Sequence, residues 1–205
     1  LTQIIAVYLI GLHLGQVNGS LKDSEVHDLY KELLELPGKI EQILETVEPL
    51  RELTRGFAKS ETVLFIGRNI GYPVVLEGAL KLKEISYIHA EAYAAGELKH
   101  GPIALVDSAV PVVVFAPKDA LFEKTISNMQ EVMARKGKIA LFSEPSGLEA
   151  AEEALWHQVP MPPCHEALTP ILYAIPAQLL AYYTAVAMGT DVDQPRNLAK
   201  SVTVE

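Results

Sequence analysis

Hydrophobic and polar residues follow a helical rhythm over the first 60 positions of the chain. Residues 2–16 are apolar on most sides of a helix, and residues 24–57 repeat apolar side chains at the three- and four-residue spacing of amphipathic helices. We expect Ser24 to cap a helix that ends near Leu36, Pro37 to start another, and Pro49 to interrupt or kink that one. The pattern predicts an N-terminal helical segment over residues 1–60.

From residue 61 onward, short apolar runs alternate with longer amphipathic stretches. Continuous apolar runs such as 62–66 are typical of strands buried in a parallel sheet. Strands alternating with helices imply a parallel sheet with helices on both faces, so we expect an α/β domain of about five strands over residues 61–188. The predicted strands are 62–66, 87–93, 111–116, 138–142 and 156–161, and the main predicted helices are 72–85, one around 122–133, and 148–155.

The stretch from Thr169 to Met188 is long and nearly uncharged. It could cross a membrane by length, but Pro176, Gln178 and three tyrosines favour a helix buried in protein. We expect Thr169 to cap this helix, with proline at its first position, and Gly189 to end it. The polar residues 189–205 form a separate tail that either frays or folds back over a site.

Composition narrows the class of protein. Of the 205 residues, 49% are hydrophobic and 21% charged, which is typical of a globular chain, and the net charge of −9 argues against a nucleic-acid partner. The single cysteine, Cys164, excludes an internal disulfide framework and suits a reducing, cytoplasmic compartment; we interpret it as a spare thiol and not a nucleophile. The apolar run at 4–14 is too short for a membrane span and lacks a basic leader.

Candidate chemistry concentrates between Leu76 and Pro102. Lys81 and Glu84 are three residues apart and share one face of the predicted helix, either as a surface ion pair or as an acid–base pair. We expect burial at the helix end to raise the pKa of Glu84. His100 lies on a predicted loop, whereas His89, within an apolar strand, is interpreted as a core histidine. The spacing of the six histidines does not resemble a metal site.

The turn Gly67–Gly71 joins a predicted strand to a predicted helix. Such a turn can bind phosphate at the helix N-terminus, but this one lacks the usual glycine and lysine motifs, so we favour a tight turn that needs glycine. Turns that follow parallel strands share the carboxyl edge of the sheet, which places this turn and the loop at 96–102 together.

Two long segments, Leu76–Pro102 and Asp191–Glu205, resemble the isomerase half of the glutamine–fructose-6-phosphate aminotransferase family. The resemblance implies a sugar-isomerase (SIS) fold with flavodoxin-like layering and no cofactor or metal. It also implies that Lys200 forms an imine with the open-chain sugar, that Glu84 moves a proton between the first two carbons with help from Lys81, and that backbone near Ala199 lines the site. His100 would serve ring opening and reach the site of a neighbouring subunit, which implies a homodimer.

The chain lacks two features of that family. No Ser/Thr-rich phosphate loop occurs in its 205 residues, and Cys164 is not an N-terminal catalytic cysteine. The resemblance therefore implies the last helices of a first SIS module plus a whole second one, with a glutaminase and the first module as partners in a longer enzyme. We expect this piece alone to have little or no synthase activity.

Two other interpretations stay open: a regulatory SIS module that binds phosphosugars, and an isomerase that does not add nitrogen. A regulator would not need Glu84 or Lys200. The catalytic interpretation requires these two residues to face a common cavity at an edge of the sheet.

Overall fold

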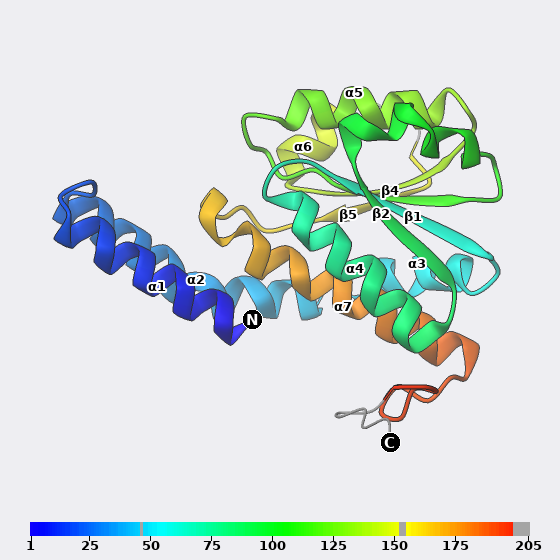
Figure 1. Ribbon diagram of the computed structural model, residues 1–205, viewed down its shortest axis with the longest axis horizontal. Coiled ribbons are helices and arrows are strands. Elements are labelled where there is room, and N and C mark those ends of the chain that lie inside the picture. The colour runs from blue at the N-terminus through cyan, green and yellow to red at the C-terminus, as the bar shows by residue number, and fades with distance from the viewer. Residues whose placement is uncertain (46, 152–154, 199–205) are drawn as a thin grey trace, which may run out of the picture.

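A five-stranded parallel sheet forms the centre of the molecule (Figure 1). The computed structural model describes residues 1–45, 47–151 and 155–198. Within these residues the strands lie in the order β2-β1-β3-β4-β5, and every neighbouring pair is parallel. The predicted α/β class is therefore confirmed. The strands are β1 (Thr62–Gly67), β2 (His89–Ala94), β3 (Pro111–Phe115), β4 (Lys138–Ser143) and β5 (His157–Pro160).

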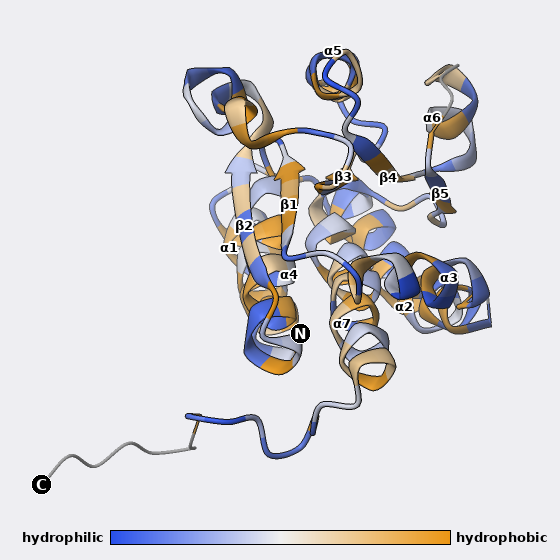
Figure 2. Ribbon diagram, turned by 90° about the vertical axis from the view of Figure 1, so that its right-hand side faces the viewer, coloured by the Kyte–Doolittle hydropathy of each residue, from blue (hydrophilic) through white to orange (hydrophobic). Residues whose placement is uncertain are grey.

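Helices cover both faces of the sheet, and the side chains that alternate along the central strands β1, β3 and β4 are buried on both sides. On β1, Val63 and Phe65 join one core cluster, whereas Leu64 and Ile66 join the other. Figure 2 shows the two helical layers, one on each side of the strands. The first layer holds α3 (Glu48–Phe57), α4 (Gly71–Ser86) and α7 (Thr169–Met188), and the second holds α5 (Phe122–Met133) and α6 (Pro145–Ala150).

Helix α7 is a core helix. Among the described residues, the helical stretch Glu166–Met188 is long and apolar enough to cross a membrane by length and composition. However, Leu172, Ala177 and Leu180 are fully buried in the main core cluster, as expected for a helix buried in protein. Gly189 ends the helix in the left-handed conformation, as predicted, at φ 70°. The cap prediction is wrong: Leu168 precedes the first turn, and Thr169 is already helical.

The N-terminal segment forms two long helices, α1 (Thr2–Val17) and α2 (Asp23–Glu45), which extend away from the sheet (Figure 1). The prediction that Pro37 separates two helices is wrong, because α2 continues through it. An interior proline costs roughly 3 kcal/mol. Leu36 and Ile43, two turns apart on α2, are both buried against the main core, and this packing offsets the cost.

The start of α2 also differs from the prediction that Ser24 caps it. The helix begins at Asp23, and the carboxylate of Glu25 accepts a hydrogen bond of 2.8 Å from the backbone N–H of Lys22. A glutamate at this position satisfies the backbone just before the first turn, as in a capping box. Of the short acidic helix expected at 148–155, residues 148–150 belong to α6, which begins earlier, at Pro145, and ends at Ala150; residues 152–154 lie outside the described residues.

Candidate functional site

Three charged residues occupy one face of α4. The ammonium Nζ of Lys81 donates a hydrogen bond of 2.7 Å to Oε2 of Glu84, and it lies 3.8 Å from Oε1 of Glu77. The side chains of Lys81 and Glu84 are 35% and 27% exposed, so the pair is partly sheltered but reachable. The hydrogen bond from Lys81 to Glu84, reinforced by the charges of Glu84 and Glu77, raises the pKa of Lys81. Lys81 therefore stays protonated beside a carboxylate.

This cluster lies at the amino edge of the sheet. Helix α4 begins directly after β1 and runs back along it, and the chain then starts β2, whose His89 pairs with Thr62 at the start of β1. A helix of this length spans about 24 Å at 1.5 Å per residue. The last turns of α4 are therefore remote from the carboxyl edge, where ligands of such sheets usually bind.

The first part of the polar tail contacts this same end of α4. The hydroxyl of Thr190 donates a hydrogen bond of 2.6 Å to the carbonyl of Ile85, and the backbone N–H of Arg196 donates one of 2.9 Å to the hydroxyl of Tyr87. The tail therefore passes beside the helix turn that carries Glu84. Ala199 and Lys200, predicted from the resemblance, lie outside the described residues.

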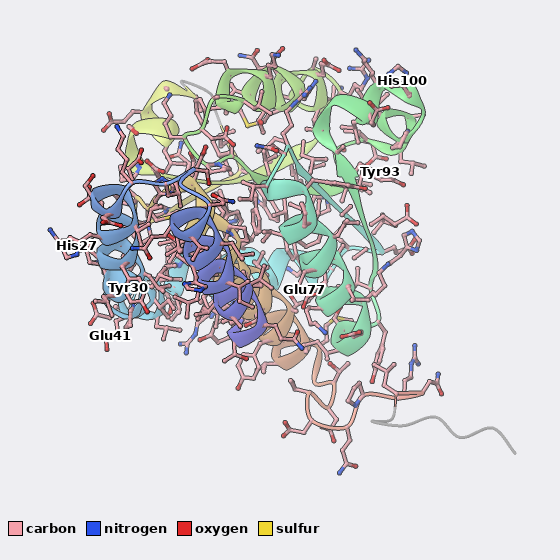
Figure 3. All side chains as sticks on the ribbon, turned by 60° about the vertical axis from the view of Figure 1, so that its left-hand side comes forward. His27, Tyr30, Glu41, Glu77, Tyr93 and His100 are labelled. Atoms are coloured by element: carbon pink, nitrogen blue, oxygen red, sulfur yellow. The ribbon has the colours of Figure 1, made fainter. Side chains whose placement is uncertain are left out.

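His100 is not brought together with Lys81 and Glu84 within one chain. It ends the 3-10 helix η1 (Ala95–His100), which follows the carboxyl end of β2, and η2 (Pro102–Leu105) continues from it. Figure 3 shows His100 at the upper edge of the molecule and Glu77 near its middle, on α4. The imidazole of His100 is 63% exposed, and its Nε2 lies 4.0 Å from a carboxylate oxygen of Glu97. It is free to contact another molecule.

A row of polar side chains lies on β2, where the sequence had suggested a core histidine. That interpretation of His89 is wrong: its side chain is 65% exposed, and its Nε2 lies 3.7 Å from Glu91. The hydroxyl of Tyr93 donates a hydrogen bond to the carboxylate of Glu91, which raises the pKa of Tyr93 to about 12. β2 is an edge strand, so hydrophobic residues next to His89 in the sequence do not ensure that its side chain is buried.

The turn after β1 has a steric need for glycine. A Cβ on Gly67 would lie 2.9 Å from the backbone oxygen of Gly71, closer than side chains tolerate. The guanidinium of Arg68 points to α5, where its Nε and Nη2 donate hydrogen bonds of 3.1 and 2.8 Å to Oδ1 of Asn128. Both observations support a tight packing turn here.

Within residues 1–45, 47–151 and 155–198, neither Cys164 nor any cluster of metal-binding side chains forms a second candidate site. Burial raises the pKa of the Cys164 thiol, whose Sγ lies 3.8 Å from Oγ1 of Thr169, so the thiol stays protonated. Over the same residues, no group of three histidine, cysteine, aspartate or glutamate side chains could hold a metal ion.

Sequence reasoning missed three residues of this region. Glu77 lies four residues before Lys81, so the helical spacing that pairs Lys81 with Glu84 could also have indicated Glu77. Tyr87 and Arg196 form a hydrogen bond although they lie 109 positions apart in the sequence, and no local sequence pattern links them.

Comparison with known proteins finds relatives that match nearly the whole chain. The SIS domain model matches residues 56–188. The chain is 55% identical over 203 residues to the glutamine–fructose-6-phosphate aminotransferase (isomerizing) of Bradyrhizobium diazoefficiens and 51% identical over 203 residues to that of Zymomonas mobilis. Each alignment covers 99% of this chain but only 33% of the relative, so the chain spans about a third of the curated relatives' length.

A solved structure shares the same arrangement. The C-terminal domain of glucosamine-fructose-6-phosphate aminotransferase from Francisella tularensis superimposes with a TM-score of 0.91 at 41% identity. The match covers 94% of this chain and 54% of that one. The described fold is thus similar to about half of that C-terminal domain.

Proposed function

Because the chain belongs to the SIS domain family, and its relatives at 50–55% identity are aminotransferases that isomerise, we propose that it is the C-terminal isomerase part of a glucosamine-6-phosphate synthase. The reaction joins fructose 6-phosphate and ammonia, which the full enzyme takes from glutamine, to give glucosamine 6-phosphate and water. The observation that carries the proposal is the hydrogen-bonded Lys81–Glu84 pair beside which the polar tail passes.

In this proposal Lys200 supplies the nucleophile. Its neutral amine attacks the C2 carbonyl of the open-chain ketose, and loss of water leaves an imine. Ammonia then replaces the lysine at C2, so nitrogen is retained on the sugar and the lysine amine is regenerated. Backbone near Ala199 lines the site. These roles rest on the resemblance of the tail to the aminotransferase family.

Glu84 moves the proton that converts the ketose skeleton to the aldose skeleton. Its carboxylate removes a proton from C1 and returns it at C2, while the C1 hydroxyl becomes the aldehyde. Lys81 supports this exchange because its ammonium, 2.7 Å from Glu84, holds the carboxylate in place. The raised pKa of Lys81 keeps that positive charge present at neutral pH.

His100 opens the sugar ring in the site of a neighbouring subunit. Its imidazole is exposed and follows the carboxyl end of β2, whereas Glu84 lies near the end of α4 at the amino edge of the sheet, which supports a role in another chain over a role in its own. We therefore propose a homodimer in which each site combines Lys81, Glu84 and Lys200 of one chain with His100 of the partner.

The proposed organisation has three parts. Residues 1–60 are the remnant of a preceding SIS module and its connector, residues 61–188 are the second SIS module, and residues 189–205 are a tail that completes the site. The glutaminase and the first SIS module are the partners within the full enzyme, which we place in the cytoplasm. The length of the curated relatives, about three times that of the chain, supports this division.

Borohydride trapping tests the imine directly. We expect the full-length protein, incubated with fructose 6-phosphate without ammonia and then reduced, to carry a stable sugar phosphate on Lys200, detected by peptide mass spectrometry. The reason is that only an imine carbon is reduced to a secondary amine under these conditions. Lys200→Arg should abolish the adduct, and Lys83, an exposed lysine on α4, serves as the internal control that stays unmodified.

Two outcomes would contradict the proposed function. Turnover without a Lys200 adduct would contradict the proposed mechanism. Sugar-phosphate binding without turnover, and with unchanged affinity in Lys200→Arg, would favour a regulatory module.

The 205-residue chain by itself is expected to be nearly inactive. Its sequence contains no Ser/Thr-rich phosphate loop, and binding energy from the phosphate is used to position the reacting carbons. We expect synthesis of glucosamine 6-phosphate from fructose 6-phosphate and ammonia to be at least about 100-fold slower than in the full-length protein, consistent with the cost of misplaced reactants. Circular dichroism establishes that the chain is folded; turnover near the full-length rate would refute the expectation.

A further inference from the structure

Tyr87 adopts a backbone conformation that side chains disfavour. It follows the last turn of α4 with φ 65° and ψ 8°, and its N–H bonds to the carbonyl of Lys83. Glycine is the usual residue at this left-handed position after a helix, because it lacks a Cβ. A tyrosine here costs conformational free energy, which points to a use for its side chain.

The side chain of Tyr87 is used to hold the tail. Its hydroxyl accepts a hydrogen bond of 2.9 Å from the backbone N–H of Arg196, and the guanidinium carbon of Arg196 lies 4.1 Å from the centre of the Tyr87 ring. A backbone contact and a cation–π contact therefore join the same two residues. The first depends on the hydroxyl and the second on the ring face.

The path of the chain between α7 and Arg196 is also fixed. The hydroxyl of Thr190 bonds to the carbonyls of Ile85 at 2.6 Å and Ala185 at 3.2 Å, and so links the ends of α4 and α7. The carboxylate of Asp191 accepts hydrogen bonds from the N–H groups of Asp193 and Gln194 at 2.9 and 3.0 Å. This turn brings the chain back to Tyr87.

We propose that Tyr87 and Arg196 form a tail clamp that positions Lys200 relative to Glu84. The inference rests on the proposed function, since it assigns a positioning role at that same site. Tyr87 is three residues after Glu84 on the end of α4, and Arg196 is four residues before Lys200. Four residues span at most about 14 Å, so the clamp limits how far the imine lysine can lie from the carboxylate.

Both clamp residues are positioning residues, because neither touches the reacting atoms in this account. Tyr87→Gly removes the side chain but suits the left-handed backbone, so the end of α4 is expected to keep its fold. Arg196→Ala removes the guanidinium from the opposite side of the clamp. Arg51→Ala is the matched control, because the Arg51 guanidinium makes the same kind of contact elsewhere, over the Tyr183 ring of α7 and 5.0 Å from its centre.

The first measurement is amide hydrogen exchange of residues 190–198 in the full-length protein. We expect exchange to be at least tenfold faster in Tyr87→Gly and in Arg196→Ala, and unchanged in Arg51→Ala. Unchanged exchange in both clamp variants would overturn the clamp, whatever the enzyme does chemically.

The second measurement is the rate at which a borohydride-trappable imine forms on Lys200. We expect it to fall about tenfold in either clamp variant, with the KM for fructose 6-phosphate changed less than twofold and the double variant no slower than the worse single one. Faster exchange with an unchanged imine rate would overturn the positioning role. If the wild-type protein forms no imine on Lys200, both the proposed function and the positioning role are overturned. The exchange result would still decide whether the clamp holds the tail.

Discussion

Replacing Glu84 with glutamine is expected to reduce turnover of fructose 6-phosphate and ammonia by about 10²- to 10⁴-fold, the range typical of losing a general acid–base group. The glutamine oxygen can still accept the hydrogen bond that Lys81 Nζ makes at 2.7 Å, so the helix face keeps its shape while the basic group is lost. Steady-state kinetics of the full-length protein measures the loss in kcat, and a borohydride adduct should still form on Lys200.

The matched control is Glu48→Gln on α3. Glu48 and Arg51 form an ion pair at the same three-residue spacing, at 3.7 Å, with the glutamate side chain 74% exposed. Exposed pairs of this kind contribute little to stability, so we expect turnover to change less than about twofold. Equal, small effects of Glu84→Gln and Glu48→Gln would mean that the Lys81–Glu84 contact is an ordinary surface ion pair.

Replacing Phe115 with alanine is expected to lower the free energy of unfolding by about 3–5 kcal/mol, the usual cost of removing a buried phenylalanine ring. Phe115 ends β3 and is fully buried. Its ring packs edge-on against Phe142 at 4.9 Å and Tyr173 at 5.6 Å between ring centres, so the change leaves a cavity between the sheet and α7. Urea unfolding of the 205-residue chain, followed by circular dichroism, measures the loss.

Leu34→Ala serves as the control for this measurement. Leu34 lies on α2 and is 73% exposed, so its truncation leaves no cavity and should change the free energy of unfolding by no more than about 0.5 kcal/mol. A loss below about 1 kcal/mol for Phe115→Ala would mean that the core around β3 closes over the cavity.

Local signals predicted the elements of the α/β part closely, because the physics that forms them is local. Continuous apolar runs gave the strands, and Gly189 ended α7 as its left-handed conformation requires. The signals failed where packing overrides propensity. Pro37 did not end α2, because continuing the helix buries Leu36 and Ile43 against the core.

Predictions about single side chains depended on which neighbours the fold supplies. The Lys81–Glu84 contact was predictable, because a helix fixes residues three apart on one face. The exposure of His89 was not, since only the strand order shows that β2 lies at the edge of the sheet. The sequence of β2 does not by itself show whether the strand lies at the edge or in the centre of the sheet.

The sequence by itself determined the parallel α/β class, the pairing of Lys81 with Glu84 on one face of α4 and, through two long matching segments, the family. Tertiary structure alone decided that this pair lies at the amino edge of the sheet, that His100 lies beyond the carboxyl end of β2, and that Arg196 meets Tyr87. The physical reason is the range of the interactions. Spacing along a helix or strand follows from backbone geometry, whereas contacts across a hundred residues exist only once the whole chain has packed.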